Sequence, residues 1–332
     1  MKKVFYSKDF KDILKIKSNF FLDNDPLLKQ AHKWNKLYSN QPKRTNCKNC
    51  GVKLGKSMIY SHFAKYTVCK SCGHFNGINQ DTEKYNKEIY SNKSSSNLYL
   101  FYKKDYSQRC KNIYLPKLKF LKKILKKKFD IIDFGCGAGH FLKVCENMNI
   151  VSSGYEFNKD SVRLGNKFLK ISKIKHIQID EIYSKILNAN SKVISLLGVI
   201  EHLRFPNKVF EAFKQSKSQY LFISVPLSSF TVLIEHVFPN VFPRLLGGVH
   251  NNLYSPESIN YTIKKHKFKI IGEWWFGSDA MGLMRSMLYN SKSKNKDYIK
   301  FFDKYCLSLV NEFQSIIDKK KLCDEVHLVI KK

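Results

Sequence analysis

The chain has no long apolar run, and acidic residues are few. It contains 27 Asp and Glu against 59 Lys and Arg in 332 residues, which gives a formal charge of +32. No apolar segment approaches the roughly 20 residues that a membrane-spanning helix needs. The first residues, MKKVFYSKDF, are charged and lack the apolar centre of a secretory signal. We therefore expect a soluble cytoplasmic protein, and 43% hydrophobic residues are enough for a folded core.

Arginine is also scarce, whereas lysine is spread through every segment. Arginine binds phosphates and bases in a bidentate manner, so its scarcity disfavours a nucleic-acid partner without excluding one. Codon bias in an AT-rich genome accounts for the lysine content, although a positive field would attract a phosphorylated or acidic small substrate. The six arginines are Arg44, Arg109, Arg163, Arg204, Arg244 and Arg285.

Four of the nine cysteines form two Cys-x2-Cys pairs. Cys47 and Cys50 make the first pair, and Cys69 and Cys72 make the second after an interval of 18 residues. This spacing is typical of structural zinc sites, in which four thiolates surround Zn²⁺ and leave no position for a catalytic water. The alternative is a pair of disulfides, which a reducing cytosol disfavours. We therefore predict a structural zinc module.

The most informative stretch is FDIIDFGCGAGHF, residues 129–141. An apolar run typical of a strand ends in a turn that carries Asp133, Gly135, Cys136, Gly137 and Gly139, and a helical pattern follows. Glycines at such a turn bring bare backbone against a small polar ligand at the edge of an α/β sheet. A dinucleotide fingerprint would require Gly or Ala where residue 140 is His, so NAD is disfavoured. The alternative is an ordinary turn between a strand and a helix.

The next predicted strand, SSGYEFN, ends at Glu156, and a carboxylate there can accept two hydrogen bonds from ribose hydroxyls. The pattern Asp-x-Gly-x-Gly-x-Gly followed by this acid resembles the first motif of class I S-adenosylmethionine (SAM)-dependent methyltransferases. The resemblance implies that the glycine turn holds the methionine part and ribose of SAM. It also implies cofactor contacts from Phe157, from Gly198 at the end of the fourth strand and from Asp180 at the end of the third. The alternative for Asp180 is a surface acid in a turn.

Regular alternation of strands and helices predicts the fold class α/β, with a doubly wound, parallel sheet. The resemblance extends from Lys117 to the C-terminus and implies a Rossmann-like sheet of seven strands, the last of them antiparallel and formed by DEVHLVIKK. The expected strands are residues 129–134, 151–156, 174–179, 192–198 and 219–225, and the expected helices are residues 140–149, 160–169 and 205–217. Ser255 is the expected N-cap of a later helix, with Pro256 at its first position.

A zinc module, then spaced tyrosines, then a class I domain resembles the zinc-containing methyltransferases that act on nucleotide-linked sugars and related precursors. The expected parts are an N-terminal helical extension (1–44), the zinc-binding module (45–80), a Tyr-rich helical connector or lid (81–116) and the SAM-binding domain (117–332). The insertion 226–254 is long enough to contribute acceptor specificity, and Arg244 within it could pair with a diphosphate or carboxylate. In that family the connector lines the acceptor pocket. The tyrosines considered as lining residues, with packing as the alternative for each, are Tyr85, Tyr90, Tyr99, Tyr102 and Tyr106.

Methyl transfer needs in-line alignment of nucleophile, carbon and sulfur, and a base if the acceptor carries a proton. His202, preceded by Glu201, follows the fourth strand, and His250 lies in GGVHNNLYS; these three residues are the candidate catalytic groups. In sugar C-methyltransferases the latter segment reads Tyr-x-Glu-His, whereas this chain has Gly247, Gly248 and Val249 before His250. The missing Tyr and Glu disfavour carbon methylation and leave oxygen methylation at least as favoured. The alternatives are that His250 only hydrogen-bonds its loop and that Glu201 and His202 only orient the strand end.

The sequence thus predicts SAM-dependent methyl transfer to a small acceptor, of the sugar, glycan or metabolite-precursor type. An RNA methyltransferase is the alternative within enzymes, but the chain has LGVIEHL after the fourth strand instead of the Asn/Asp-Pro-Pro-aromatic segment of amino-group methylators. A non-catalytic nucleic-acid-binding or scaffold protein is the alternative from another class. The intact acidic and glycine positions argue against it.

Overall fold

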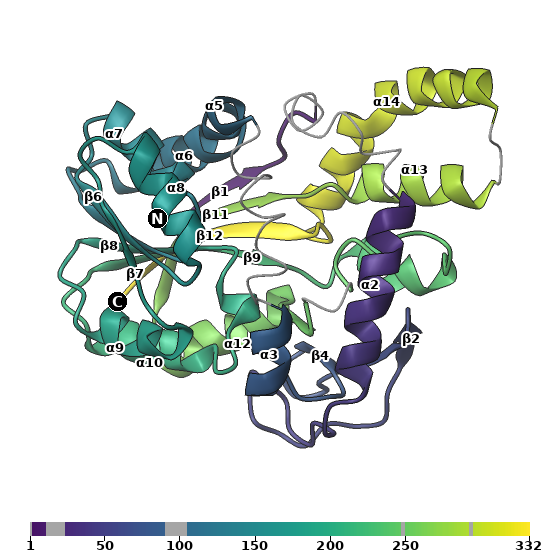
Figure 1. Ribbon diagram of the computed structural model, residues 1–332, viewed down its shortest axis with the longest axis horizontal. Helices are drawn as coiled ribbons and strands as arrows, with labels where there is room; N and C mark the ends of the chain where they lie inside the picture. Colours follow the sequence, from purple (N-terminus) through teal and green to yellow (C-terminus); the bar gives the residue numbers. More distant parts are fainter. Residues whose placement is uncertain (1, 11–23, 90–104, 247–249, 292–294) are drawn as a thin grey trace.

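The computed structural model describes residues 2–10, 24–89, 105–246, 250–291 and 295–332. An eight-stranded sheet with helices on both faces forms the larger part, and a four-stranded sheet forms a smaller module beside it (Figure 1). The strand order of the larger sheet is β1-β11-β12-β9-β8-β5-β6-β7. Its strands are β1 (Lys3–Tyr6), β5 (Ile131–Phe134), β6 (Ser152–Glu156), β7 (Ile174–His176), β8 (Val193–Leu197), β9 (Tyr220–Pro226), β11 (Lys269–Phe276) and β12 (Glu325–Lys331).

The larger sheet confirms the predicted α/β class. Strands β7, β6, β5, β8 and β9 pair in parallel, and β12 runs antiparallel between β9 and β11. The third predicted strand is shorter than expected, because it ends at His176 instead of residue 179. The carboxyl ends of β5, β6 and β8 therefore lie side by side, and this edge is where an open parallel sheet places its ligand.

The N-terminal segment differs from its prediction as a helical extension. Residues 3–6 form β1, which pairs in parallel with β11 at the edge of the sheet and makes it eight-stranded instead of seven-stranded. Phe5 packs edge-on against Phe120 at 5.6 Å between ring centroids. The prediction was wrong here because a four-residue strand is too short for its periodicity to be recognised. Helix α2 (Asn24–Ser39) is the helical part of this segment.

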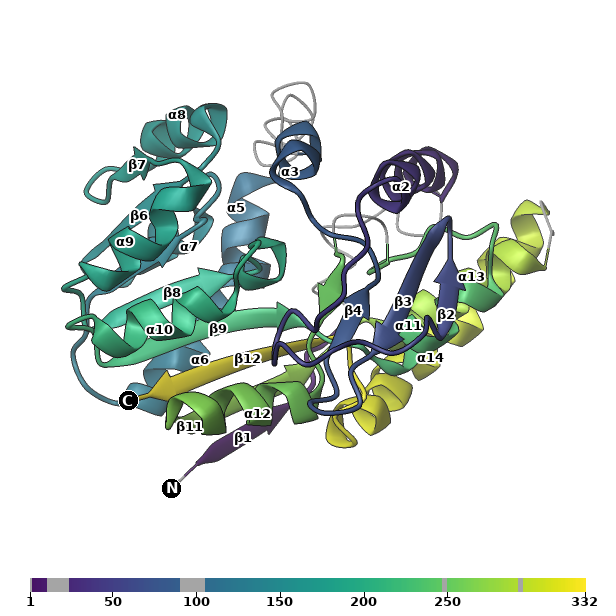
Figure 2. The ribbon, with the colours of Figure 1, turned by 90° about the horizontal axis from the view of Figure 1, so that it is seen from below.

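The two faces of the sheet carry separate sets of helices (Figures 1 and 2). Right-handed crossovers explain the division, since the chain winds in one direction from β5 to β7 and in the other from β8 to β9. Ser255 caps α12 as predicted, because its side chain accepts the N–H of Ser258 and Pro256 is the first helical residue. One face carries α6 (Leu115–Leu125), α7 (His140–Asn147) and α8 (Lys159–Phe168), and the other carries α9 (Ile182–Leu187), α10 (Asn207–Gln215) and α12 (Pro256–His266).

Apolar side chains fill both layers between the sheet and its helices. Phe222 of β9 contacts Phe120 and Phe141 on the α6 and α7 side, each at 6.1 Å between centroids. On the other side, Phe210 and Phe213 of α10 are almost fully buried. These layers fix the strands, so the loops at their carboxyl ends start from rigid positions.

The smaller module contains the predicted zinc-binding segment and one unexpected strand. Its sheet has the order β10-β4-β3-β2, and β10 belongs to the end of the insertion 226–254. The strands are β2 (Ile59–Ser61), β3 (Ala64–Val68), β4 (Phe75–Gly77) and β10 (Asn252–Leu253). The insertion and the zinc-binding segment therefore share one sheet.

The remaining helices lie in the segments between these strands along the chain. None of the helices in the described ranges is long and apolar enough to cross a membrane. The predicted domain boundaries otherwise stay predictions. The remaining helices are α3 (Glu83–Ile89), α5 (Tyr106–Arg109), η1 (Cys110–Tyr114), η2 (Ile179–Glu181), η3 (Ile200–His202), α11 (Phe230–Ile234), η4 (Glu235–Val237), α13 (Asp279–Asn290) and α14 (Lys296–Lys319).

Candidate active site

The glycine turn joins β5 to α7 and needs glycine for two separate reasons. Gly135, Gly137 and Gly139 have φ of 68°, 54° and 74°, a left-handed conformation that favours glycine. A Cβ on Gly135 would lie 2.6 Å from a methyl group of Val199, which follows β8. The turn is therefore pressed against the end of β8, and a larger residue at position 135 would separate the two.

Two buried carboxylates flank this turn. Asp133 is 2% exposed and accepts a hydrogen bond from the Ser195 hydroxyl at 2.7 Å; burial raises its pKa to about 7. Glu156 at the end of β6 accepts the N–H of Gly137 at 2.8 Å and that of Asn158 at 2.9 Å. Burial raises the pKa of Glu156, and these two N–H donors oppose that shift. Each carboxylate oxygen retains a lone pair, so Glu156 can also accept ribose hydroxyls.

The other predicted cofactor residues are Gly198, Cys136, Phe157 and Asp180, and they differ in exposure and position. Gly198 follows β8 with φ of 72°, and its N–H donates to Ser224 O at 3.0 Å. Cys136 is buried, and its sulfur would lie 2.7 Å from a Cβ on Gly154, so only its backbone faces the turn. Phe157 follows Glu156 directly and is half-buried against the core. Asp180 is exposed on η2, four residues beyond the end of β7 instead of at the strand end.

The tyrosines of the connector pack instead of lining a pocket, as far as they are described. Tyr85 is 1% exposed in the core of the smaller module. Tyr106 donates to Ala138 O at 3.1 Å and stacks on His140 at 4.2 Å, which fixes the start of α7 from outside. These two tyrosines therefore fit the packing alternative. The other three, Tyr90, Tyr99 and Tyr102, lie outside the described residues.

The three predicted catalytic side chains meet beside the end of β8. Glu201 and His202 belong to η3, and His250 arrives from the end of the insertion. His202 Nε2 lies 3.8 Å from Glu201 Oε1, and the rings of His202 and His250 stack at 5.0 Å. Glu201 Oε1 lies 3.6 Å from the place of a Cβ on Gly198, which puts the cluster at the end of β8, where the next residue, Val199, contacts Gly135 of the glycine turn. Gly247, Gly248 and Val249, which precede His250, lie outside the described residues.

Burial shifts the pKa values of Glu201 and His250 in opposite directions. Glu201 is 3% exposed, and burial raises its pKa to about 8. Burial lowers the pKa of His250 to about 4, although a hydrogen bond from its Nδ1 to Leu245 O at 3.1 Å opposes this. A carbonyl oxygen only accepts, so Nδ1 of His250 carries the hydrogen and Nε2 holds the lone pair. The arrangement presents a carboxylate and imidazoles to one small volume.

The four predicted metal ligands also come together. The sulfur atoms of Cys47 and Cys72 lie 3.7 Å apart, and those of Cys50 and Cys69 lie 3.5 Å apart. A tetrahedral Zn²⁺ with Zn–S of 2.3 Å requires sulfur atoms about 3.8 Å apart, so the cluster fits zinc with little movement. Gly51 and Gly73, with φ of 81° and 71°, follow the pairs and form the tight turns that aim two sulfurs at one point.

The smaller module is hydrogen-bonded directly to the cluster of predicted catalytic residues. Asn252 of β10 accepts from His74 Nε2 at 3.1 Å through its side-chain oxygen, and its side-chain nitrogen donates to Glu201 O at 3.0 Å. Gly77 N–H donates to Asn251 O at 2.7 Å within the shared sheet. Sequence reasoning missed Asn252, and no local pattern marks it because its partners lie far away in the chain.

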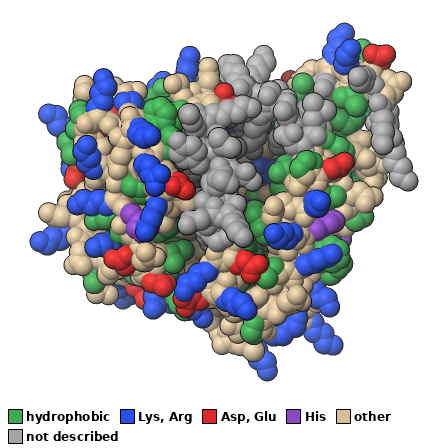
Figure 3. Space-filling model, in the orientation of Figure 1, with side chains coloured by type: hydrophobic (Ala, Val, Ile, Leu, Met, Phe, Trp, Pro, Cys, Tyr) green, Lys and Arg blue, Asp and Glu red, His purple; other side chains and the backbone are tan. Residues whose placement is uncertain are grey.

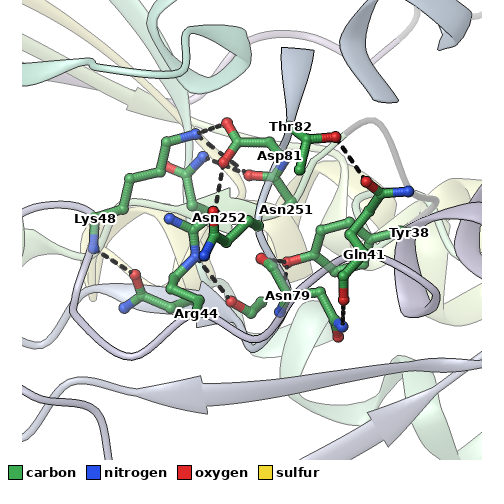
Figure 4. A network of polar contacts seen from close by, with 12 residues as sticks. Tyr38, Gln41, Arg44, Lys48, Asn79, Asp81, Thr82, Asn251 and Asn252 are labelled. Atoms are coloured by element: carbon green, nitrogen blue, oxygen red, sulfur yellow. Dashed lines mark hydrogen bonds and ion pairs between the residues drawn. The ribbon is translucent and has the colours of Figure 1, made fainter. Parts of the chain in front are cut away.

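A buried ionic network supports the same contact (Figure 4). Asp81 binds Arg44 Nη2 and Lys48 Nζ, each at 2.6 Å, and Lys48 Nζ also lies 3.4 Å from Asn251 Oδ1. Burial alone would raise the pKa of Asp81, but the two cations hold that pKa below its usual value. The network ties Lys48, which lies within the first cysteine pair, to Asn251, the residue before Asn252.

We expect Asp81→Asn to lower the free energy of unfolding at pH 7 by about 3–5 kcal/mol, because it leaves two buried cations without their anion. The folded-state pKa of Asp81 is lowered. Its stabilisation is therefore present above the unfolded-state pKa, about 3.9, and is lost as the pH falls through the lower folded-state pKa. Urea unfolding at several pH values measures both effects, with Asp160→Asn on the surface of α8 as the control. Equal stability of the Asp81 variant and the natural protein would contradict this role.

The structure changes the role expected for Arg244. Its guanidinium forms an ion pair with Asp324, which is 3% exposed and also accepts the N–H of Ser278 at 3.1 Å. Arg244 is 19% exposed at its side chain and is already paired with a protein anion. The expectation that it binds an acidic group of the acceptor is therefore wrong, because the nearby buried carboxylate competes for the same donors.

Basic side chains are distributed instead of gathered. On the face shown in Figure 3, Lys and Arg lie over several elements and alternate with Asp and Glu. A nucleic-acid groove would require a continuous basic stripe to follow the phosphates. The visible face adds no support for a nucleic-acid partner.

Comparison with known proteins identifies the larger part of this chain. A family model described as a methyltransferase domain matches residues 102–273, which is more than half of the 332 residues. The protein is thus a class I SAM-dependent methyltransferase, as the glycine turn and its acid predicted. It belongs to this methyltransferase domain family. A search of curated proteins found no match.

Several solved structures of methyltransferases are similar to this chain. Phosphoethanolamine N-methyltransferase 2 of Haemonchus contortus in complex with SAM has a TM-score of 0.50 at 11% identity, over 78% of this chain and 62% of that one. A SAM-dependent methyltransferase from Archaeoglobus fulgidus has a TM-score of 0.41 at 16% identity, over 66% and 93%. Magnesium protoporphyrin IX methyltransferase from Synechocystis PCC 6803 with bound S-adenosylhomocysteine has a TM-score of 0.46 at 8% identity, over 76% and 100%.

Proposed function

We propose that this enzyme transfers a methyl group from SAM to a hydroxyl oxygen of a small acceptor, of the sugar or glycan-precursor type. The observation that carries the proposal is the cluster of Glu201, His202 and His250 beside the glycine turn. The cluster places groups able to handle a proton next to the expected methyl donor. The segment LGVIEHL after β8, in place of the motif of amino-group methylators, favours oxygen over nitrogen.

In this proposal the carboxyl ends of β5, β6 and β8 bind SAM. The backbone of the glycine turn lies against the methionine part and ribose, and Glu156 accepts the ribose hydroxyls. Asp180 on η2 accepts from the adenine amino group. Zn²⁺ bound by the four thiolates of Cys47, Cys50, Cys69 and Cys72 stabilises the smaller module and takes no part in the reaction.

The reaction is an in-line displacement. The acceptor hydroxyl loses its proton, its oxygen attacks the methyl carbon, and the carbon–sulfur bond breaks with its electron pair going to sulfur, which leaves S-adenosylhomocysteine. The chain mainly contributes alignment of the three reacting atoms and a place for the proton. His250 is the proposed proton acceptor, because its Nδ1–H is bonded to Leu245 O and Nε2 is available.

We expect His250→Ala to lower turnover by about 10²–10⁴-fold, the usual contribution of general base catalysis, and to leave SAM affinity unchanged. The measurement is mass-spectrometric detection of one added CH₂ unit across nucleotide sugars and cell-envelope precursors, with SAM binding followed by calorimetry. His236→Ala is the control, since His236 is exposed on η4 in the same insertion. A fully active His250 variant would remove this residue from the reaction, and a panel without any methylated sugar would overturn the acceptor class.

A further inference from the structure

The cluster beside β8 has the composition of a metal site. One carboxylate oxygen of Glu201 and one ring nitrogen each of His202 and His250 lie within 4.8 Å of one another. We propose that these three side chains bind a divalent transition-metal cation, and that the acceptor oxygen coordinates it. The inference rests on the proposed function, because it says how the same cluster activates the acceptor.

The distances are close to those of a filled site. A cation about 2.0–2.2 Å from each nitrogen and oxygen ligand brings its ligand atoms to about 3–3.5 Å from one another. His202 Nε2 and Glu201 Oε1 are 3.8 Å apart, so these two atoms have to approach each other by less than about 1 Å. A small rotation of either side chain provides a movement of this size. The other ligand atoms lie within 4.8 Å of one another, so the three side chains have to approach by less than about 2 Å to close around a cation.

The ligand atoms are held from behind, as in protein metal sites. Leu245 O fixes the tautomer of His250 and leaves its Nε2 for the cation, a contact that metal-binding histidines usually make with a carbonyl or carboxylate. Glu235 in turn accepts the N–H groups of Arg244 and Leu245 at 3.0 and 3.2 Å, which fixes that carbonyl. On the other side, Asn252 holds the backbone of Glu201 at 3.0 Å.

A second observation points to a ligand at this place. Glu201 is 3% exposed, and its Oε2 has no hydrogen-bond partner within the part of the chain that the structure describes. An orphaned buried carboxylate oxygen is costly. Lys117, the cation that acts electrostatically on Glu201, already forms an ion pair with Glu325 at 3.6 Å. A cation held by both carboxylate oxygens of Glu201 would supply the missing partner of Oε2.

The donor set indicates which cation fits. Two imidazoles and one carboxylate are typical of transition-metal ions, whereas Mg²⁺ and Ca²⁺ prefer oxygen ligands alone. Three protein ligands leave positions open, unlike the four thiolates of the smaller module, so a substrate oxygen can bind. The two sites would differ in metal preference as well as in role.

A bound cation would activate the acceptor without a protein base. It lowers the pKa of the coordinated hydroxyl, whose proton passes to water. The oxygen then forms its bond to the methyl carbon, the carbon–sulfur bond breaks, and the electron pair goes to sulfur. The cation keeps its charge throughout. In this form of the mechanism the Nε2 lone pair of His250 is given to the cation instead of to a proton, so the two roles exclude each other.

The test is a titration of the full chain with Mn²⁺, after dialysis against a chelator mild enough to retain one zinc per chain by metal analysis. The electron paramagnetic resonance signal of free Mn²⁺ reports binding, and thiolates do not prefer Mn²⁺. We expect one Mn²⁺ per chain. His250→Ala and Glu201→Gln should each weaken its binding at least tenfold, and His236→Ala should leave it unchanged. If His250→Ala does not fold, the isosteric Glu201→Gln carries the comparison.

Absence of Mn²⁺ binding, or equal binding by the natural protein and Glu201→Gln, would overturn the cation site. Methyl transfer that proceeds at full rate after chelation would also overturn it while leaving the proposed function in place. Conversely, Mn²⁺ binding together with no methylation of any hydroxyl acceptor would support the cation site and overturn the acceptor assignment. Methyl transfer that falls on chelation and returns with Mn²⁺ supports both.

Discussion

Replacing Glu156 with alanine is expected to weaken SAM binding by about 10²–10⁴-fold. Two hydrogen bonds from ribose hydroxyls to a carboxylate each contribute about 1.5–3 kcal/mol, and their loss corresponds to that range of affinity. The same carboxylate holds the N–H of Gly137 at 2.8 Å, so the variant also loosens the turn that faces the cofactor. Isothermal calorimetry with SAM measures the effect directly.

The matched control is Asp160→Ala, an acid on the exposed side of α8 that pairs only with its helical neighbour Arg163 at 3.6 Å among the interactions described. Asp160→Ala removes one negative charge from the region, as Glu156→Ala does, but leaves the hydrogen bond to the glycine turn intact. Unchanged SAM affinity in the Glu156 variant would remove this residue from the ribose contact. An equal loss in both variants would assign the effect to net charge instead.

Loss of the zinc site is the second change with a large expected effect. We expect Cys72→Ser to abolish zinc binding and to unfold the smaller module, because apparent zinc affinities in small modules are about 10–16 kcal/mol and exceed what such a core supplies alone. Turnover should fall with it, since β4 then no longer pairs with β10 and Asn252 no longer holds Glu201. SAM binding should suffer less, because the glycine turn belongs to the larger sheet.

Metal analysis, circular dichroism and methyl transfer measure these effects together. Cys306→Ser, on α14 and outside the cluster, is the control for loss of a thiol. A chain that is fully folded with no metal and with all four thiols free would contradict the module. A Cys72 variant that loses zinc but keeps its turnover would show instead that the module does not position the catalytic cluster.

Much of the site could be predicted because its signals are local. Two cysteines three positions apart lie on one tight turn wherever that turn is, and three glycines after a strand permit a left-handed turn that other residues adopt only at a cost. The strand ends that carry Asp133 and Glu156 follow from the alternation of strands and helices, which places consecutive parallel strands at one edge. This alternation did not predict β1, because its four residues are too few to show the periodicity of a strand.

The amino-acid sequence by itself determined the methyltransferase fold, the glycine turn and the four thiolates, since these depend on motif spacing and on the alternation of strands and helices along the chain. Only the tertiary structure decided that β10 joins the smaller sheet, that Arg244 pairs with Asp324 and that Glu201 meets His250. These contacts join residues far apart in the chain, and their energies depend on burial, which no local pattern records. Folding removes Glu201 from water and leaves its Oε2 without a hydrogen-bond partner among the described residues. A bound ligand would offset the cost of burying that oxygen.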